Sequence, residues 1–263
     1  MGIELAFIIP LKSAKVSSDW ERTQEMLRNT LASVTQQPGC RAIVVCNEPP
    51  DVDATIVEAN FQVQSLTFEE ARNDKMRKCH LGLQHAASFS PKRAMLLDAD
   101  DLVHREFVKH VSRFDPSFGV IVRHGYRYII GDKHLRRSFV FHHMSASSIV
   151  FPYSQDLGSG PSDFYMTRQD HIKPIEAAFR AQGIPYGYLR FPACVYLRGS
   201  NDSMRDNVQL ARRNAGTKRT SLRKRIRTYF WKALGRSIGN IQITKKHLEA
   251  FPGLAAYADG GSA

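Results

Sequence analysis

The 263-residue sequence lacks several features that would assign it to a familiar class of protein. No apolar run approaches the roughly 20 residues that span a bilayer, so we expect no membrane-spanning helix. There is no H-E-x-x-H pair and no G-x-G-x-x-G sequence, and the segment PLKSAKVSSD after the first apolar run contains no glycine. These absences argue against structural zinc and against a dinucleotide-dependent oxidoreductase, and they disfavour a nucleotidyltransferase with a glycine-rich phosphate loop.

Cysteine is also scarce. The chain has four cysteines, without a C-x-x-C pair or a zinc-binding spacing: Cys40, Cys46, Cys79 and Cys194. The first residues, MGIELAFIIPLK, are typical of a strand rather than a signal peptide, because the apolar stretch is short and no basic region precedes it. Ala6 stands where an N-myristoylation motif needs Ser or Thr. We therefore expect a cytoplasmic protein with reduced thiols.

Positive charge is concentrated in one part of the chain. There are 37 Lys and Arg against 25 Asp and Glu, which gives a net charge of +12. Between Arg205 and Lys246 there are 13 basic residues and a single acid, Asp206, so the remainder of the chain is balanced. This asymmetry predicts an acidic partner surface for the segment.

Apolar runs alternate with helix-periodic segments in residues 1–117. Strands are expected at 5–11, 41–46, 61–68 and 93–97, and helices at 19–36, 69–87 and 102–114. This order predicts an α/β fold with a Rossmann-type, mostly parallel central sheet flanked by helices. In such sheets ligands bind beyond the carboxyl ends of the strands.

The pattern changes after residue 118. Segments 118–132 and 137–151 are typical of antiparallel strands joined by a turn at Gly131-Asp132. A polar loop at 157–163, a helix at 170–182 and one or two strands at 186–199 follow. We expect 1–117 to bind a nucleotide sugar, 118–204 to form a mixed or antiparallel acceptor-binding part of the same domain, and 205–263 to be a basic, largely helical segment.

The segment MLLDADD (95–101) ends a predicted strand with three carboxylates. An Asp-x-Asp arrangement can present oxygen ligands to Mg²⁺ or Mn²⁺. Alternatively, Asp100 or Asp101 could N-cap a helix that begins near Leu102. A cap needs only one carboxylate, whereas three adjacent carboxylates repel one another unless a cation neutralises them, so we favour a metal site.

Five segments, in order, resemble the nucleotide-sugar half of GT-A-fold glycosyltransferases, in particular the family 2 of inverting bacterial enzymes. They are AFIIPLK, TLASVTQQ, AIVVCNE, KMRKCHLGLQHA and AMLLDADDLV. The resemblance covers about the first 115 residues. It implies a GT-A-like fold, a nucleoside-diphosphate sugar as donor, and Mn²⁺ or Mg²⁺ as cofactor.

The resemblance also implies roles for residues at the strand ends. Pro10 would line the nucleotide pocket, and Asn47 or Glu48 would lie near the base, where the family usually has Asp. Lys75 and Lys78 would lie near the diphosphate, although both could also belong to a solvated helix face. Because the Asp near the base is replaced, the identity of the base stays open, with a UDP-sugar favoured.

The three acids of MLLDADD receive different roles from the same resemblance. Asp98 would contact the ribose or the sugar, and Asp100 would bind the metal. Asp101 would cap the following helix, which leaves room for both interpretations of the segment.

A general base is expected in the second half, where the family has an acidic pair at the start of a helix. The matching positions are Gln169 and Asp170, so Asp170 is the candidate catalytic base and Asp163 is the alternative. His171 could be a further metal ligand, a residue that orients one, or a surface histidine. His142 and His143 should point to opposite faces of a strand, so at most one of them can face the site.

The basic segment (residues 205–236) contains an amphipathic, helix-periodic stretch at 221–235. Its aromatic residues Tyr229, Phe230 and Trp231 favour an anionic membrane surface, where each nearby cation contributes about 1 kcal/mol. A solvated helix and an anionic acceptor are alternatives. Nucleic acid is disfavoured because no nucleic-acid-binding motif accompanies the charges.

Together these features predict a cytoplasmic enzyme, peripheral at the inner face of the membrane. It would move a sugar from a nucleoside-diphosphate sugar to a cell-surface polysaccharide, such as lipopolysaccharide, or to a lipid-linked glycan, with inversion. The alternatives are a nucleotidyltransferase that acts on a sugar phosphate, and a nucleic-acid-binding protein that uses the basic segment.

Overall fold

The computed structural model describes residues 2–52, 60–62, 74–153, 175–199 and 239–258. Its strands are Leu5–Pro10 (β1), Cys40–Cys46 (β2), Asn60–Gln62 (β3), Arg93–Leu96 (β4), Asp101–Val103 (β5), Gly119–Ile129 (β6), His134–Ser138 (β7), Ile149–Pro152 (β8), Tyr186–Arg198 (β9) and Asn240–Gln242 (β10). Its α-helices are Trp20–Val34 (α1), Lys75–Ala86 (α3), Phe107–Val111 (α4), Ile175–Ala181 (α7), Lys245–Ala250 (α10) and Ala255–Ala258 (α11). Two 3₁₀ turns cover Ala87–Phe89 (η1) and Phe141–His143 (η2).

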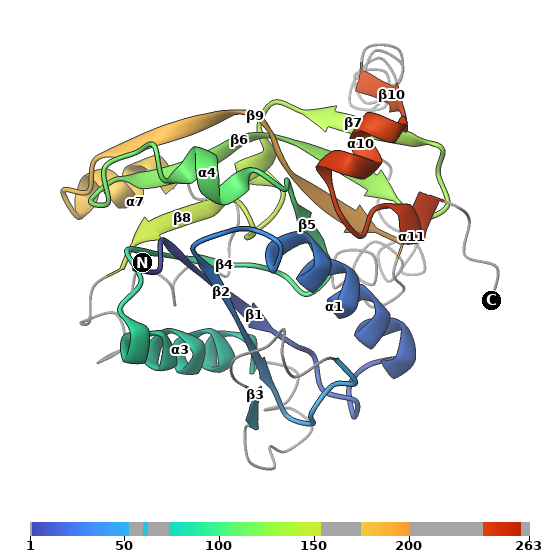
Figure 1. Ribbon diagram of the computed structural model, residues 1–263, viewed down its shortest axis with the longest axis horizontal. Coiled ribbons are helices and arrows are strands. Elements are labelled where there is room, and N and C mark those ends of the chain that lie inside the picture. The colour runs from blue at the N-terminus through green and yellow to red at the C-terminus, as the bar shows by residue number, and fades with distance from the viewer. Residues whose placement is uncertain (1, 53–59, 63–73, 154–174, 200–238, 259–263) are drawn as a thin grey trace, which may run out of the picture.

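These strands form one mixed sheet in the order β10-β7-β6-β8-β4-β1-β2-β3, while β9 pairs with both β5 and β6 (Figure 1). Strands β4, β1, β2 and β3 are parallel, as expected for the first half. Of the nine strand pairings among the described residues, however, only four are parallel. The α/β class is confirmed, but the sheet is mixed rather than mostly parallel, because β8 returns antiparallel beside β4.

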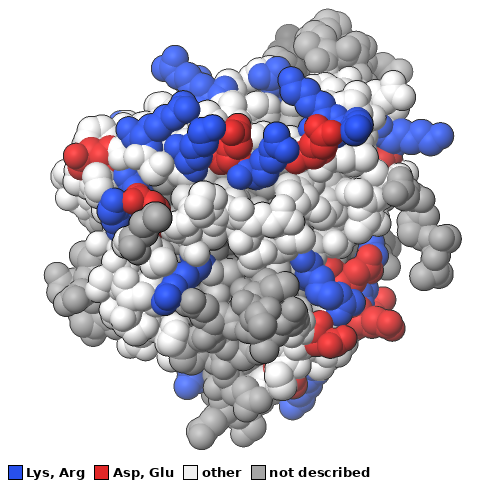
Figure 2. All heavy atoms as spheres, in the orientation of Figure 1, with Lys and Arg blue, Asp and Glu red and all other residues white. Residues whose placement is uncertain are grey.

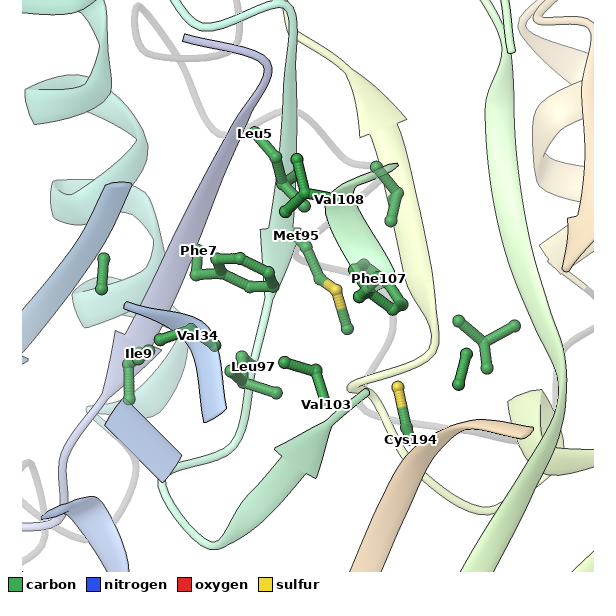
Figure 3. Packing of buried hydrophobic residues seen from close by; sticks show 14 of the residues in the cluster. Leu5, Phe7, Ile9, Val34, Met95, Leu97, Val103, Phe107, Val108 and Cys194 are labelled. Carbon is green, nitrogen blue, oxygen red and sulfur yellow. The ribbon is translucent and has the colours of Figure 1, made fainter. Parts of the chain in front are cut away.

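Helices α1 and α3 cover opposite faces of the parallel strands (Figure 1). Alternate residues of β1 explain this arrangement, because Phe7 packs in the cluster with α1 and Ile8 packs in the cluster with α3. Helix α1 begins at its N-cap Asp19, whose carboxylate accepts a hydrogen bond from the Arg22 N–H at 2.9 Å. The close packing around Phe7, Met95 and Phe107 fills the space between β1, β4 and α4 (Figure 3).

The helix expected at 102–114 is wrong over its first part. Residues Asp101–Val103 form strand β5, which pairs antiparallel with β9, and α4 is confined to Phe107–Val111. Leu102 and Val103 are buried in different apolar clusters, as alternation along a strand requires. Both residues gain full burial in this way, so pairing with β9 overrides the helical spacing seen in the sequence.

The second half agrees with the expected hairpin in part, because β6 and β7 are antiparallel around the predicted turn at Gly131-Asp132. Segment 137–151 does not form one strand: β7 ends at Ser138, the η2 turn follows, and β8 begins at Ile149. His142 and His143 lie in η2, so the expectation of two opposite strand faces is wrong. The turn fits because Gly125 leaves space for Phe141; a Cβ at Gly125 would approach the Phe141 ring to 2.3 Å.

The described end of the chain joins this part of the sheet. Strand β10 pairs antiparallel with β7, and Phe251, Leu254 and Tyr257 are buried. The Tyr128 hydroxyl donates to the carbonyl oxygen of Tyr257 at 2.8 Å. Residues 239–258 are therefore an integral part of the fold, whereas the expected helix at 221–235 lies outside the described residues.

Two expectations from composition can be compared with the structure. None of the helices in the described ranges is long and apolar enough to cross a membrane. All four cysteines are free. Burial raises the pKa of Cys40 and of Cys46 to about 11, so these thiols are poor nucleophiles near neutral pH.

Candidate functional site

The carboxyl ends of β4, β1 and β2 lie side by side at one edge of the sheet. Hydrogen bonds continue beyond the strands: the Leu11 N–H donates to Val45 O, and the Leu97 N–H donates to Ile8 O, each at 2.9 Å. Because the strands are parallel and adjacent, this edge brings together Pro10, Asn47 and the acidic loop, which we define as residues 98–101. The structure thus gathers the residues that the sequence placed at the strand ends.

Lys78 ties this edge together from α3. Its Nζ lies 2.5 Å from Asp74 Oδ2 and donates to the carbonyl oxygen of Leu11 at 2.7 Å and to Asn47 Oδ1. The side chain is 1% exposed, so its three donors are directed at protein oxygens just after β1 and β2 and at the N-cap of α3. Lys78 therefore acts as an internal brace in this structure, and it is not on a solvated helix face.

Lys75 lies one turn earlier on α3 and contacts the acidic loop. Its Nζ is 2.5 Å from Asp98 Oδ1, and the two side chains are 40% and 24% exposed. Burial lowers the pKa of Lys75, but the charge of Asp98 and the hydrogen bond to it outweigh this effect, so the net shift is upward. A permanent cation thus lies beside Asp98 at a position that solvent and ligand can reach.

The acidic loop is held from two other sides. Thr30 of α1 donates its hydroxyl hydrogen to the carbonyl oxygen of Ala99 at 2.8 Å. From the segment before β8, Ser147 Oγ accepts the Asp98 N–H at 2.8 Å. A tight turn closes the loop itself, because the Asp101 N–H donates to Asp98 O at 3.0 Å. These contacts fix the backbone that carries Asp98 and Asp100.

Asp101 is not the helix cap that the sequence predicted. It is fully buried at the start of β5, and its Oδ2 accepts a hydrogen bond from Ser145 Oγ at 2.7 Å. Burial, together with the charges of Asp100 and Asp98, raises the pKa of Asp101 well above its ordinary value. Asp101 anchors the loop to the protein interior, and Asp98 and Asp100 remain partly exposed.

Ser145 and Ser147 contact the acidic loop, and no sequence pattern predicted this role. The two serines hold the acidic loop from the protein interior, and the Ser147 N–H donates to Ser145 Oγ at 2.9 Å, so the two act as one unit. No local signal could have shown this, because Ser147 is 49 residues from Asp98 in the chain.

Glu48 and the histidines also have defined contacts. Glu48 Oε2 accepts the Ala14 N–H at 3.1 Å and so holds the loop between β1 and α1 over the end of β2. His142 is buried, with its Nε2 3.4 Å from Glu176 Oε1 of α7. His142 thus links η2 to α7.

The donor chemistry of the loop suits a hard divalent cation. Asp98 and Asp100 offer carboxylate oxygens at the sheet edge, and Mg²⁺ or Mn²⁺ commonly takes one or two such ligands together with substrate phosphates. Within the described ranges, no group of three or more His, Cys, Asp or Glu is placed to hold a metal ion. A bound metal would therefore take its remaining ligands from substrate, water or other parts of the chain.

Several predicted residues lie outside the described residues. They are the candidate base Asp170, its alternative Asp163, the possible metal ligand His171 and the basic segment 205–236.

No protein-family model matches the chain, and no curated protein matches it at a significant level. Solved structures do show similarity. The 1–349 fragment of TarS from S. aureus has a TM-score of 0.44 and 10% identity over 74% of this chain, and the chain spans 60% of that fragment. The same fragment in complex with UDP-GlcNAc has a TM-score of 0.45 and 10% identity, covering 75% of this chain and 59% of that one.

A candidate nucleotide-diphospho-sugar transferase from Desulfovibrio desulfuricans G20 covers 90% of this chain and 97% of its own, with a TM-score of 0.38 and 14% identity. UDP-GlcNAc and UDP are ligands of TarS in those structures.

Proposed function

We propose that the protein is a metal-dependent glycosyltransferase that uses a nucleoside-diphosphate sugar, with a UDP-sugar favoured. The acceptor is a cell-surface polysaccharide or a lipid-linked glycan. Support comes from the order of the five sequence motifs and from the geometry of the strand ends.

One observation carries the proposal. The partly exposed Asp98 and Asp100 are held at the shared carboxyl edge of β4, β1 and β2, with the Lys75 ammonium 2.5 Å from Asp98. A sugar nucleotide needs this combination, because carboxylates can bind a hydroxyl or a cation while a cation can attract the diphosphate. The brace of Lys78 and the serines behind the loop hold the groups in place before substrate arrives.

In the proposed reaction, Asp98 orients the ribose or the sugar and Asp100 holds the cation. A Mn²⁺ or Mg²⁺ ion held by Asp100 would offset the charge that develops on the departing nucleoside diphosphate. Lys75 lies on the same side and adds positive charge near Asp98. Asp170 accepts the proton of the acceptor hydroxyl as that oxygen attacks the anomeric carbon, and direct displacement inverts the configuration.

The test is a donor-binding and transfer assay with Asp100→Ala. UDP-, GDP-, CMP- and TDP-sugars are first screened by thermal shift with and without Mn²⁺, since a ligand that binds the native state raises the midpoint of unfolding. We expect a metal-dependent shift with one nucleotide, and transfer activity at least 100-fold lower in Asp100→Ala, in line with losses of a few kcal/mol for such groups.

Glu249→Gln is the matched control, because Glu249 is an exposed carboxylate on α10. Its activity should equal that of the unmodified protein. Full transfer activity in Asp100→Ala, with its melting temperature unchanged, would eliminate the metal role of this residue.

Peripheral association with the inner face of the membrane is also proposed, through the basic segment 205–236. Deleting residues 205–263 would be a poor test, because residues 239–258 are built into the sheet. Replacing Arg223, Lys224, Arg225 and Arg227 by Gln keeps that end intact.

With these four replacements we expect sedimentation with phosphatidylglycerol vesicles to drop severalfold, since each near-surface cation contributes about 1 kcal/mol. Sugar-nucleotide binding should be unaffected. Unchanged vesicle binding would refute membrane association through this segment, and tight binding of RNA or DNA without any sugar-nucleotide binding would favour the nucleic-acid alternative.

A further inference from the structure

A row of polar side chains crosses the sheet beside the acidic loop. Asp101 in β5 pairs with Tyr196 in β9, Tyr196 pairs with Arg127 in β6, and Arg127 pairs with Arg136 in β7. Residues directly opposite in neighbouring strands project from the same face of a sheet. The row therefore runs over one face from the acidic loop to two adjacent arginines.

A third arginine belongs to the same face. Arg198 follows Tyr196 by two positions in β9, so the two side chains point the same way. Neighbouring strands are about 4.8 Å apart, and alternate residues along a strand are about 7 Å apart. The guanidinium groups of Arg127, Arg136 and Arg198 are hence within reach of one ligand, one to three strands away from Asp101. We call these three residues the arginine row.

This face is opposite to the one that the end of the chain covers. Helices α10 and α11 pack over Tyr128, Leu135 and Leu197, which alternate with the arginine row along β6, β7 and β9 (Figure 1). The arginines are therefore not required for that apolar packing, and all three are only partly buried.

The local charges favour an anion. Arg127 lies directly opposite Arg136, and like charges in opposed positions destabilise a sheet. Arg136 Nη2 donates to Asp132 Oδ2 at 3.3 Å, but its buried Nε–H donates to no atom of the described residues. Arg127 and Arg198 also have interactions of their own. What the arginine row offers a ligand is therefore a concentration of positive charge.

The chemistry of arginine favours one class of anion, the phosphate group. Its planar guanidinium can donate two parallel hydrogen bonds to a phosphate, and several such groups compensate the charge of the anion. Two phosphate sources are available to the proposed function: the diphosphate of the donor, and a phosphate carried by the acceptor.

We propose that the arginine row is an anion subsite beside the acidic loop and that it binds a phosphate group of one of the two substrates. The inference rests on the proposed function for the identity of those substrates. The subsite itself is an inference from strand register and charge.

The experiment measures binding of inorganic pyrophosphate, UDP and uridine to the full chain by titration calorimetry with Mn²⁺ present. Arg127→Gln and Arg136→Gln are compared with Arg190→Gln, an exposed position in β9 about 20 Å along the strand from Tyr196. We expect the dissociation constant for pyrophosphate to rise about tenfold in the first two variants and to stay within twofold in the third.

Binding of UDP and uridine distinguishes the donor diphosphate from an acceptor phosphate as the ligand of the arginine row. If the row binds the donor, UDP affinity falls in parallel with pyrophosphate affinity while uridine affinity does not change. If it binds an acceptor phosphate, UDP affinity stays within twofold and only pyrophosphate affinity falls. Arg136→Lys keeps the charge without the paired donors, and it should give an intermediate loss if either substitution to Gln disturbs folding.

The inference is overturned if every variant binds pyrophosphate and UDP as the control does, or if the unmodified chain binds neither. Its failure can be told apart from that of the proposed function. Absence of any sugar-nucleotide binding, with pyrophosphate binding that still depends on Arg127, would refute the enzyme proposal and leave the subsite standing.

Discussion

Strands β1, β2 and β4 are buried along nearly their whole length, whereas β7 and the later parts of β6 and β9 mix buried side chains with partly buried ones. The first group is covered on both faces, by α1 and α3. In the second group, α10 and α11 pack over one face. These strands lie toward the edge of the sheet that is formed by β10. Figure 2 shows Lys and Arg side chains gathered in the upper half of the view, the region of α4 and α10 in Figure 1.

This difference determines where each part can bind a ligand. A strand covered on both faces can offer polar groups only at its ends, which is where Pro10, Asn47 and Asp98 lie. A strand with partly buried positions on one face can present polar side chains along its length, as the arginine row does. The acidic loop connects binding at strand ends with binding along a strand face, because it leaves the end of β4 and continues into β5.

The largest loss of stability in the parallel part of the sheet is expected from Lys78→Met. The change removes the partner of buried Asp74, so an uncompensated carboxylate remains, and we expect about 3–5 kcal/mol less stability by urea unfolding. Lys75→Met is the control, because its partly exposed pair with Asp98 should contribute less than about 1 kcal/mol. A loss below about 1 kcal/mol for Lys78→Met would contradict the bracing role.

A smaller effect on stability, dependent on pH, is expected from His104, which lies where the described end of the chain meets β9. The His104 ring lies edge-on to Phe191 and Phe251, with centroids 5.2 Å and 5.3 Å away. Burial lowers the pKa of His104; the charges of His110 and Arg105 act in the same direction, and Glu106 opposes them. The unfolded chain therefore takes up a proton at higher pH than the folded one, so stability falls as pH decreases below about 6.5.

His104→Gln should reduce the drop in melting temperature between pH 7 and pH 5 by on the order of 1 °C, because one of the groups that bind protons on unfolding is removed. His134→Gln, at an exposed position, is the matched control. An identical pH dependence in His104→Gln and the unmodified protein would show that His104 does not contribute.

Much of the parallel part could be predicted from local pattern. The strands at 5–11, 41–46 and 93–97 and the first helix were found within a few residues of their true bounds. Burial of both faces gives a continuous apolar run, which is visible without knowledge of the neighbours. The antiparallel part was less predictable, because alternation in 118–132 and 137–151 does not reveal which strand lies beside which.

The candidate site shows the same division. The sequence pointed to Asp98, Asp100 and Lys75, which share a strand end and a preceding helix. It missed Ser145 and Ser147 and assigned Asp101 to a helix cap, because their contacts join segments more than 40 residues apart. Lys78 could not be distinguished from a surface lysine, since its burial depends on how α3 lies against β1 and β2.

By itself, the sequence determined the α/β order, the strand ends where polar residues follow apolar runs, and the acidic loop, because these depend on hydrophobic periodicity over short stretches. Only the tertiary structure decided the partner and register of each strand, the burial of Asp101 and Lys78, and the alignment of Arg127 with Arg136. The physical reason is that a shift of one residue in register moves every side chain of a strand to the opposite face, and register is set by contacts between distant parts of the chain.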